Sequence, residues 1–159
     1  MSGGNTPAVV ALTRSRVPFT PHEYELAASE ATYGESVAAS LGVAPHRLFK
    51  TLVAEVDGRH VVAIVPTHLR LGLKALASAA RGKKAKMADP ADAERLTGYV
   101  TGGISPFGQK RRMPVFVDSS VNDHATVYVS GGRRGLQVEV GPADLVALLG
   151  AVEVADLGV

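Results

Sequence analysis

Apolar residues along this 159-residue chain follow two spacings, and each spacing predicts one type of element. Alternating or unbroken apolar runs of about four to eight residues are typical of strands, whereas apolar residues three or four positions apart are typical of helices. The strands expected on this ground cover residues 19–24, 51–56, 60–65, 114–118, 126–130 and 136–140. The expected helices cover residues 7–14, 33–41, 73–80, 90–96 and 143–149.

Proline, glycine and polar capping residues mark where several of these elements begin and end. Thr6-Pro7 and Asp89-Pro90 each place a capping side chain before a proline, which is typical of a helix start. Gly42 and Gly150 follow expected helices, at the position where a left-handed residue commonly ends a helix. Asp57-Gly58 lies between two β-rich runs and predicts a hairpin.

Strands and helices alternate without a regular strand–helix–strand repeat, which favours a mixed or antiparallel sheet. Residues 61–65 are apolar at every position, so this strand is expected to be covered on both faces. The sequence contains no internal repeat and no low-complexity linker. We therefore predict one domain over residues 1–159 of mixed α/β (α+β) class, with helices around the sheet and residues 1–5 flexible.

Composition narrows the class of protein further. Hydrophobic residues make up 46% and charged residues 20%, as in globular proteins, and cysteine is absent, which excludes disulfides and thiolate chemistry. The longest purely apolar run is far shorter than the ~20 residues of a membrane-spanning helix. The N-terminus lacks the pattern of a signal peptide. We expect a cytoplasmic protein that does not enter a membrane.

The segment 97–112, TGYVTGGISPFGQKRR, carries four glycines and ends in three positive charges. Glycine allows close approach of the main chain to a ligand, so this loop suits an anionic ligand, although it could also simply turn a corner. Its spacing approaches that of a phosphate-binding P-loop. However, Arg111 stands where that motif needs serine or threonine, so a nucleoside triphosphatase is not expected.

Positive charge is clustered although the net charge is only +2. Such clusters are typical of nucleic-acid contacts. The clustered residues are Arg81, Lys83, Lys84 and Lys86, then Lys110, Arg111 and Arg112, then Arg133 and Arg134.

Several single residues allow both a structural and a functional interpretation. Lys50 begins a strand directed at the core, where a lysine either reaches the surface or serves a site. Tyr24 and Tyr33 suit either the edge of a core or a ligand contact. The stretch 130–135, SGGRRG, is either a second anion-binding turn or a hairpin connection.

The five histidines do not indicate a metal site, because none pairs with another at metal-ligand spacing and no HExxH motif occurs. Asp123-His124 with a serine could imitate a catalytic triad, but the sequence has no Gly-x-Ser-x-Gly elbow. We therefore expect neither a metal nor any other cofactor.

Six short motifs are distributed along the chain. They are TPAV near the N-terminus, Phe49-Lys50-Thr51-Leu52, Met87-Ala88-Asp89-Pro90, Thr97-Gly98-Tyr99, GGISPFGQK and VSGG-x-x-G. In this combination the chain resembles the bacterial YbaK/EbsC family of cysteinyl-tRNA(Pro) deacylases, which is related to the editing domain of some prolyl-tRNA synthetases. The resemblance extends from Thr6 to about Leu149.

This resemblance implies a mostly antiparallel, barrel-like sheet surrounded by helices, and removal of cysteine from mischarged tRNA(Pro), and from tRNA(Cys) as a further possible substrate. Lys50, Gly102 and Gly103 take the catalytic positions. The implied substrate-binding residues are Tyr24, Tyr33, Thr51, Ile104, Ser105, Pro106, Ser130 and Gln137. Family members often have an acidic residue where this chain has Gln137, so a role that needs a carboxylate there is in doubt.

The resemblance also implies a mechanism in which the substrate's own thiol attacks its ester and releases a thiolactone. Lys50 would bind the terminal phosphate or stabilise negative charge, and the Gly102-Gly103 main chain would contact the ester. Lys110, Arg111 and Arg112 would steer the RNA. Prolyl-tRNA synthetase is the implied partner and would supply tRNA selectivity. The alternatives are an Ala-tRNA(Pro) deacylase that positions a water, and a non-catalytic module that binds tRNA acceptor ends.

Overall fold

The computed structural model describes residues 6–25 and 33–159, with side chains in the second helix described from Val37 onward. The prediction for residues 1–5 lies outside this range. The helices are α1 (Pro7–Ser15), α2 (Tyr33–Leu41), α3 (Leu73–Ala79), α4 (Pro90–Thr97) and α5 (Pro142–Leu149), with 3-10 turns η1 (Pro45–Arg47) and η2 (Ser119–Asp123). The strands are β1 (Phe19–Glu23), β2 (Phe49–Val56), β3 (Arg59–Pro66), β4 (Ala85–Met87), β5 (Val115–Asp118), β6 (Val127–Arg133), β7 (Leu136–Val140) and β8 (Val152–Val154).

The strands form two sheets, a five-stranded one in the order β4-β2-β3-β5-β8 and a three-stranded one in the order β1-β7-β6. The pairings of β5 with β3 and β8 are parallel, and the other pairings are antiparallel. The predicted mixed α/β class is confirmed. The predicted barrel-like closure is wrong, because among the described residues the two sheets are joined by an isolated bridge between Leu48, just before β2, and Tyr128 of β6 instead of a full ladder.

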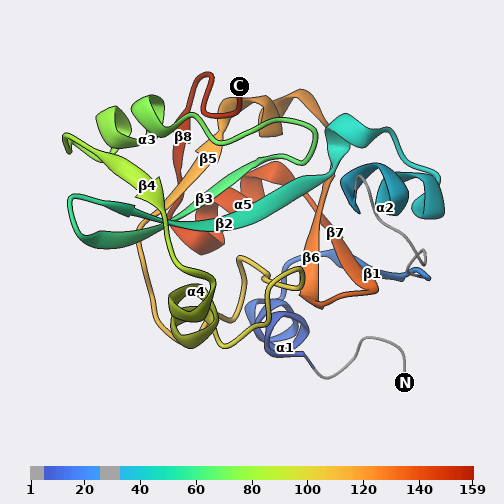
Figure 1. Ribbon diagram of the computed structural model, residues 1–159. Coiled ribbons are helices and arrows are strands. Elements are labelled where there is room, and N and C mark those ends of the chain that lie inside the picture. The colour runs from blue at the N-terminus through green and yellow to red at the C-terminus, as the bar shows by residue number, and fades with distance from the viewer. Residues whose placement is uncertain (1–5, 26–32) are drawn as a thin grey trace.

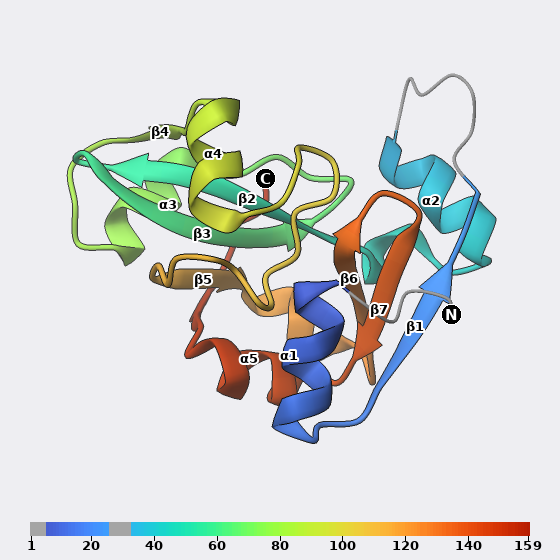
Figure 2. The same ribbon diagram turned by 90° about the horizontal axis from the view of Figure 1, so that it is seen from below.

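Helices cover both faces of the β2–β3 hairpin, with α3 on one side and α4 on the other (Figures 1 and 2). The two sides have separate cores. On the α3 side, Leu76 packs with Val61 and Val65, whereas on the α4 side Leu96 packs with Val62 and Ile64. This arrangement confirms that β3 is buried on both faces, as its unbroken apolar run predicts.

Local signals in the sequence fix most of the element boundaries. The Thr6 side chain accepts a hydrogen bond of 3.2 Å from the Val9 amide, as expected of an N-cap. Gly42 and Gly150 have positive φ after α2 and α5. Asp89 occupies the N-cap position of α4 but makes no capping hydrogen bond, so this part of the prediction is wrong.

The short strands β4 and β8 were not predicted, because three residues are too few to show a period. Of the two readings of residues 130–135, the hairpin is confirmed, since β6 pairs with β7 up to the Arg133–Leu136 pair, past a register shift after Ser130. Over the described residues, no helix combines the length and the apolar character that crossing a membrane requires.

Candidate active site

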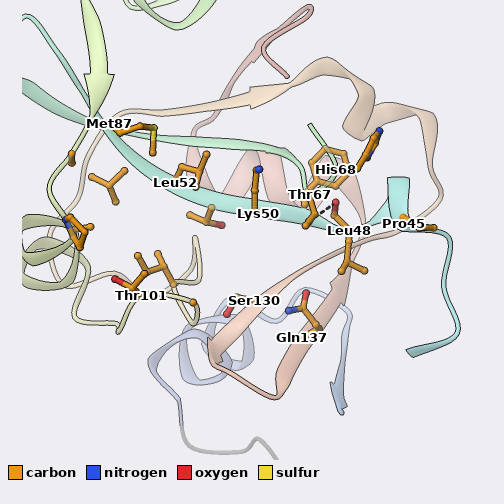
Figure 3. A pocket seen from close by; sticks show the side chains of 18 residues that line it. Pro45, Leu48, Lys50, Leu52, Thr67, His68, Met87, Thr101, Ser130 and Gln137 are labelled. Carbon is orange, nitrogen blue, oxygen red and sulfur yellow. Dashed lines mark hydrogen bonds between the residues drawn. The ribbon is translucent and has the colours of Figure 1, made fainter. Parts of the chain in front are cut away.

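A pocket of about 700 Å³ opens beside the first half of β2 (Figure 3). Its walls come from β2, the loop after β3, the start of α4, the glycine loop 97–112 and the β6–β7 hairpin. The lining residues are Pro45, Leu48, Phe49, Lys50, Thr51, Leu52, Val53, Thr67, His68, Met87, Ala88, Pro90, Ala93, Thr101, Gly102, Ile104, Ser130 and Gln137.

The pocket lies where one edge of β2 is left open. Strand β4 pairs only with Ala54–Val56, and the bridge to Tyr128 is made at Leu48, so the stretch between them has no strand partner on this edge among the described residues. The Val53 carbonyl accepts a hydrogen bond from Ala88 across the same edge. Because main-chain groups alternate along an antiparallel strand, the N–H and C=O of Thr51 also point to this edge and face the pocket.

Lys50 and Thr51 project to opposite sides of β2, as successive residues of a strand must. Figure 3 shows the Lys50 ammonium on the same side as Leu52 and His68, whereas Ser130 and Gln137 lie on the other side. Burial lowers the pKa of Lys50, and the nearby positive charge of Arg70 lowers it further. The pocket therefore has a cationic half and a neutral polar half.

The neutral half contains two buried acceptors without partners. Thr51 is 8% and Gln137 is 5% exposed, and neither Thr51 Oγ1 nor Gln137 Oε1 makes a hydrogen bond within the described structure. Buried polar atoms are nearly always hydrogen-bonded, and leaving one unpaired costs about 1–3 kcal/mol. Both atoms line the same pocket, so their geometry suits a ligand that donates hydrogen bonds.

The glycine loop forms a wall of this half and is fastened at several points. Gly102 lines the pocket with a φ of +90°, and a Cβ there would come within 3.3 Å of the Arg134 side chain. The Thr101 amide donates a hydrogen bond of 2.8 Å to Glu94 Oε2, and this bond lowers the pKa of Glu94. The loop is thereby tied to α4.

Three predicted loop residues support the wall without lining the pocket. Gly103 is buried, and a Cβ there would lie 2.9 Å from Arg133 Cα, so close packing against the hairpin requires glycine. The buried Ser105 accepts a hydrogen bond of 3.2 Å from the Phe107 amide. Pro106 is buried as well. Only Gly102 and Ile104 of the predicted loop residues belong to the lining.

The remaining predicted residues lie elsewhere. Tyr24 lines a separate, more polar cavity with Arg133 and Gly135. Tyr33 begins α2, and its side chain lies outside the described part of the structure. The run 110–112 is exposed and is not part of the lining, although its first two amides bond to the C-terminal end of α4.

His68 and Thr67 belong to the lining but were not predicted as site residues. They follow β3 directly, and the antiparallel hairpin pairs Lys50 with Val65, which brings the end of β3 beside the predicted lysine. The hairpin predicted at Asp57-Gly58 therefore implied that the residues just after β3 lie near Lys50. Met87 lies in the motif Met87-Ala88-Asp89-Pro90 that the family resemblance uses, whereas Ala93 of α4 had no signal in the sequence.

The described lining contains no aspartate, glutamate or cysteine. It offers one ammonium group, several hydroxyl and amide groups, one exposed imidazole and an open strand edge. Such a set can bind and orient a ligand that carries both anionic and hydrogen-bond-donating groups. A protein carboxylate or thiol that could act as base or nucleophile is missing from this part of the structure.

Comparison with known proteins places this geometry in a family. Residues 28–148 match the family model described as "Aminoacyl-tRNA editing domain". An Enterococcus faecalis protein named "Putative Cys-tRNA(Pro)/Cys-tRNA(Cys) deacylase EbsC" is 39% identical, over 90% of this chain and 87% of its own length. The Escherichia coli multifunctional Ser/Thr-tRNA deacylase ProXp-y is 35% identical over 53% of each chain.

The fold recurs in a solved structure titled as that of "a putative trans-editing enzyme for prolyl tRNA synthetase". It has a TM-score of 0.81 and 24% identity, and the match covers 94% of this chain and 95% of that one. A segment amounting to 18% of the Streptococcus suis proline–tRNA ligase is 28% identical to 70% of this chain. The chain belongs to the aminoacyl-tRNA editing domain family, as its resemblance to the YbaK/EbsC proteins predicted.

Proposed function

We propose that this protein is an aminoacyl-tRNA editing enzyme that removes cysteine from Cys-tRNA(Pro). The observation that carries the proposal is the pocket lining within residues 6–25 and 33–159, which combines Lys50 with unpaired buried acceptors and contains no carboxylate or thiol. A site of this kind suits a substrate that brings its own nucleophile. The name of the 39% identical Enterococcus faecalis relative supports the same substrate.

In the proposed reaction, the cysteine sulfur attacks the carbonyl carbon of its own ester. A new C–S bond closes a thiolactone, the bond from the carbonyl carbon to the ribose oxygen breaks, and the thiol proton goes to that oxygen. The protein then only has to hold the aminoacyl group in the attacking conformation. Orientation of this kind lowers the barrier of favourable intramolecular reactions by about 7–11 kcal/mol.

The two halves of the pocket suggest how the substrate binds. Lys50 would hold the phosphate of the terminal nucleotide, on the side of β2 that it shares with His68. Thr51 Oγ1 and Gln137 Oε1 would accept hydrogen bonds from the α-ammonium group on the other side. Gly102 would let the ester approach the main chain, whereas Gly103 supports the loop from behind.

Gln137 gives this arrangement a neutral acceptor where family members often carry an acid. A neutral amide can accept a hydrogen bond from an ammonium group, so binding does not require a carboxylate. Ser130 lies beside it and accepts a hydrogen bond of 3.2 Å from the Gly132 amide, which fixes its hydroxyl oxygen at the wall of the pocket.

The decisive experiment measures deacylation of tRNA(Pro) charged with cysteine, alanine, serine or proline, and of Cys-tRNA(Cys). Cysteine should be removed far faster than serine, because a hydroxyl is a much poorer internal nucleophile than a thiol. Lys50→Ala should reduce the rate on Cys-tRNA(Pro) by about 10²–10³, the usual cost of losing one electrostatic contact. Equal rates on cysteine and serine would exclude the thiol mechanism.

A second candidate function is hydrolysis of other aminoacyl esters, such as Ala-tRNA(Pro), by a positioned water. Two observations favour it: His68 lines the pocket, and the Escherichia coli Ser/Thr-tRNA deacylase is similar to half of the chain. His68→Gln distinguishes the two mechanisms. It should leave thiol-assisted cleavage nearly unchanged and should slow hydrolysis if the imidazole activates water.

The third interpretation, a non-catalytic module that binds acceptor ends, predicts binding of acceptor-stem RNA without turnover of any substrate in the panel.

We also propose that exposed Lys110, Arg111 and Arg112 steer RNA and that prolyl-tRNA synthetase supplies tRNA selectivity. A strong preference of the isolated protein for tRNA(Pro) over tRNA(Cys), both charged with cysteine, would contradict the proposed role of the synthetase.

A further inference from the structure

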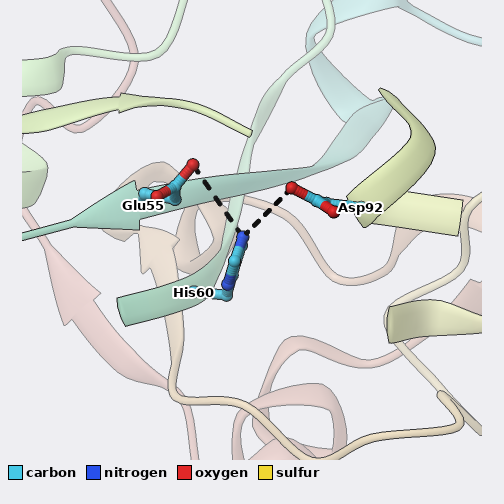
Figure 4. A group of neighbouring side chains, drawn as sticks. All are labelled: Glu55, His60 and Asp92. Atoms are coloured by element: carbon cyan, nitrogen blue, oxygen red, sulfur yellow. Dashed lines mark ion pairs between the residues drawn. The ribbon is translucent and has the colours of Figure 1, made fainter. Parts of the chain in front are cut away.

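A cluster of three potential metal ligands lies outside the pocket, on the hairpin and the neighbouring helix (Figure 4). His60 Nε2 is 3.9 Å from Glu55 Oε2 and 4.0 Å from Asp92 Oδ2. All three ligand atoms lie within 4.8 Å of one another. None of these residues belongs to the lining of the proposed active site.

The fold brings these side chains together from distant parts of the sequence. Glu55 and His60 are directly opposed in the antiparallel β2–β3 ladder, so their side chains leave the same face of the sheet. Asp92 lies in the first turn of α4, which packs against that face. Figure 4 shows the imidazole pointing between the two carboxylates.

The imidazole nitrogen at the centre of the cluster is buried and makes no hydrogen bond within the described structure. Both carboxylate oxygens are too distant from it for a hydrogen bond, which needs about 2.7–3.2 Å. Two exposed cations lie at the edge of the cluster. Arg95 contacts the other oxygen of Asp92, Oδ1, at 3.1 Å, and Lys86 Nζ is 4.0 Å from Glu55 Oε2.

We propose that Glu55, His60 and Asp92 bind a divalent transition-metal cation of the Zn²⁺ class. The nearest point equidistant from three atoms with these separations lies at most about 2.5 Å from each. Zn²⁺ binds imidazole and carboxylate ligands at about 2.0–2.2 Å, so side-chain shifts of a few tenths of an ångström complete the site. An imidazole ligand favours Zn²⁺ and the neighbouring late first-row cations over Mg²⁺, Ca²⁺ and Mn²⁺, which suit oxygen ligands.

This proposal departs from the expectation, based on histidine spacing alone, that the protein binds no metal. Histidine spacing could not reveal it, because two of the three ligands are carboxylates. The bound cation would join the β2–β3 hairpin to α4. Since α4 supplies Pro90 and Ala93 to the pocket and Glu94 holds the glycine loop, the metal would stabilise the wall of the proposed active site.

The test is calorimetric titration of the untagged full chain with Zn²⁺, without RNA, so that its outcome is independent of the proposed deacylation. We expect one equivalent to bind. His60→Ala and Asp92→Asn should each weaken binding by more than about 100-fold, since even residues that only orient a metal ligand contribute about 10–100-fold. At a free Zn²⁺ concentration about 100 times the dissociation constant, the melting temperature should rise by about 5–10 °C.

A matched control removes two histidines that lie outside the cluster and next to each other. These are His46 and His124, whose ring centroids lie 5.1 Å apart. The double variant His46→Gln, His124→Gln should bind Zn²⁺ with unchanged affinity. Co²⁺ should give visible absorption bands in the wild type and in this control but not in His60→Ala. Absence of saturable binding, or loss of binding in the control with retention in both ligand variants, would overturn the proposal and show an ion-pair cluster only.

Discussion

The Tyr99 hydroxyl donates a hydrogen bond of 2.6 Å to the main-chain oxygen of Phe107 and thereby closes the glycine loop on itself. Both residues are buried, at 4% and 3% exposure. The bond spans the segment that contains Gly102, Gly103 and Ile104. The Tyr99 hydroxyl thus helps to fix the loop that forms one wall of the pocket.

Replacing Tyr99 with phenylalanine should therefore destabilise the protein and loosen the pocket. The carbonyl of Phe107 would stay buried without its donor, which costs about 1–3 kcal/mol. Denaturant unfolding measures the loss, and deacylation of Cys-tRNA(Pro) should fall with it. A variant with full stability and full activity would show that the loop does not need this bond.

The same residue predicts a loss of stability in alkali. Burial raises the pKa of Tyr99 to about 12. Below pH 10 the phenol is neutral in both the folded and the unfolded chain. Between pH 10 and 12 it ionises only in the unfolded chain, so wild type should lose roughly 2 kcal/mol relative to Tyr99→Phe. Unfolding curves of both proteins across this range check the difference, in which the titration of other groups cancels.

Gly102 should be required for deacylation, and not only for the stability of the fold. Gly102→Ala places a Cβ at a φ of +90°, a strain of about 1–2 kcal/mol, and sets that Cβ 3.3 Å from the Arg134 side chain, so this part of the pocket wall has to adjust. Gly58→Ala is the matched control, because Gly58 has a φ of +85°, no neighbour within 4 Å of an added Cβ, and a position in the hairpin turn. Both variants should lose similar stability, and only Gly102→Ala should lose most of its deacylation rate.

The sequence predicted this fold well where the signal is local. The proline, glycine and capping residues mark the ends of α1, α2 and α5, and the Asp57-Gly58 turn sets the register that puts Lys50 opposite Val65. Sheet closure was predicted wrongly because it depends on pairing between distant strands. Nothing local to β2 or β6 shows that the described residues of the two sheets are joined by an isolated bridge between Leu48 and Tyr128 instead of a ladder.

The candidate site was predicted in part from the sequence motifs. Lys50, Thr51 and Gly102 lie in motifs that the family resemblance carries, and all three line the pocket. Gly103 belongs to the same motif, yet its glycine is explained by packing against Arg133. A motif records that a residue type is needed, and the structure distinguishes whether a ligand or a neighbouring chain segment needs it.

Thr51 offers a test in which stability and activity should change in opposite directions. Thr51→Val keeps the shape and removes a buried hydroxyl that has no partner, so the free energy of unfolding should stay equal or rise by about 1 kcal/mol. If the hydroxyl binds the substrate ammonium, deacylation should fall about 10–100-fold.

Ser120→Ala is the control for this change. Ser120 Oγ is likewise without a hydrogen bond but does not line the pocket. The control should show a similar effect on stability and none on rate. Full activity of Thr51→Val would remove the hydroxyl from the proposed binding scheme.

The Lys50 ammonium should set the alkaline limit of the reaction, and Arg70 should tune it. Burial and the charge of Arg70 both lower the pKa of Lys50, so the phosphate contact is lost at a lower pH than an ordinary lysine would allow. Arg70→Gln removes the like charge and raises that pKa. The alkaline limb of kcat/KM for Cys-tRNA(Pro), corrected for uncatalysed hydrolysis, should therefore move to higher pH. Arg70→Lys keeps the charge and should leave the limb in place, and an equal shift in both variants would contradict an electrostatic role for Arg70.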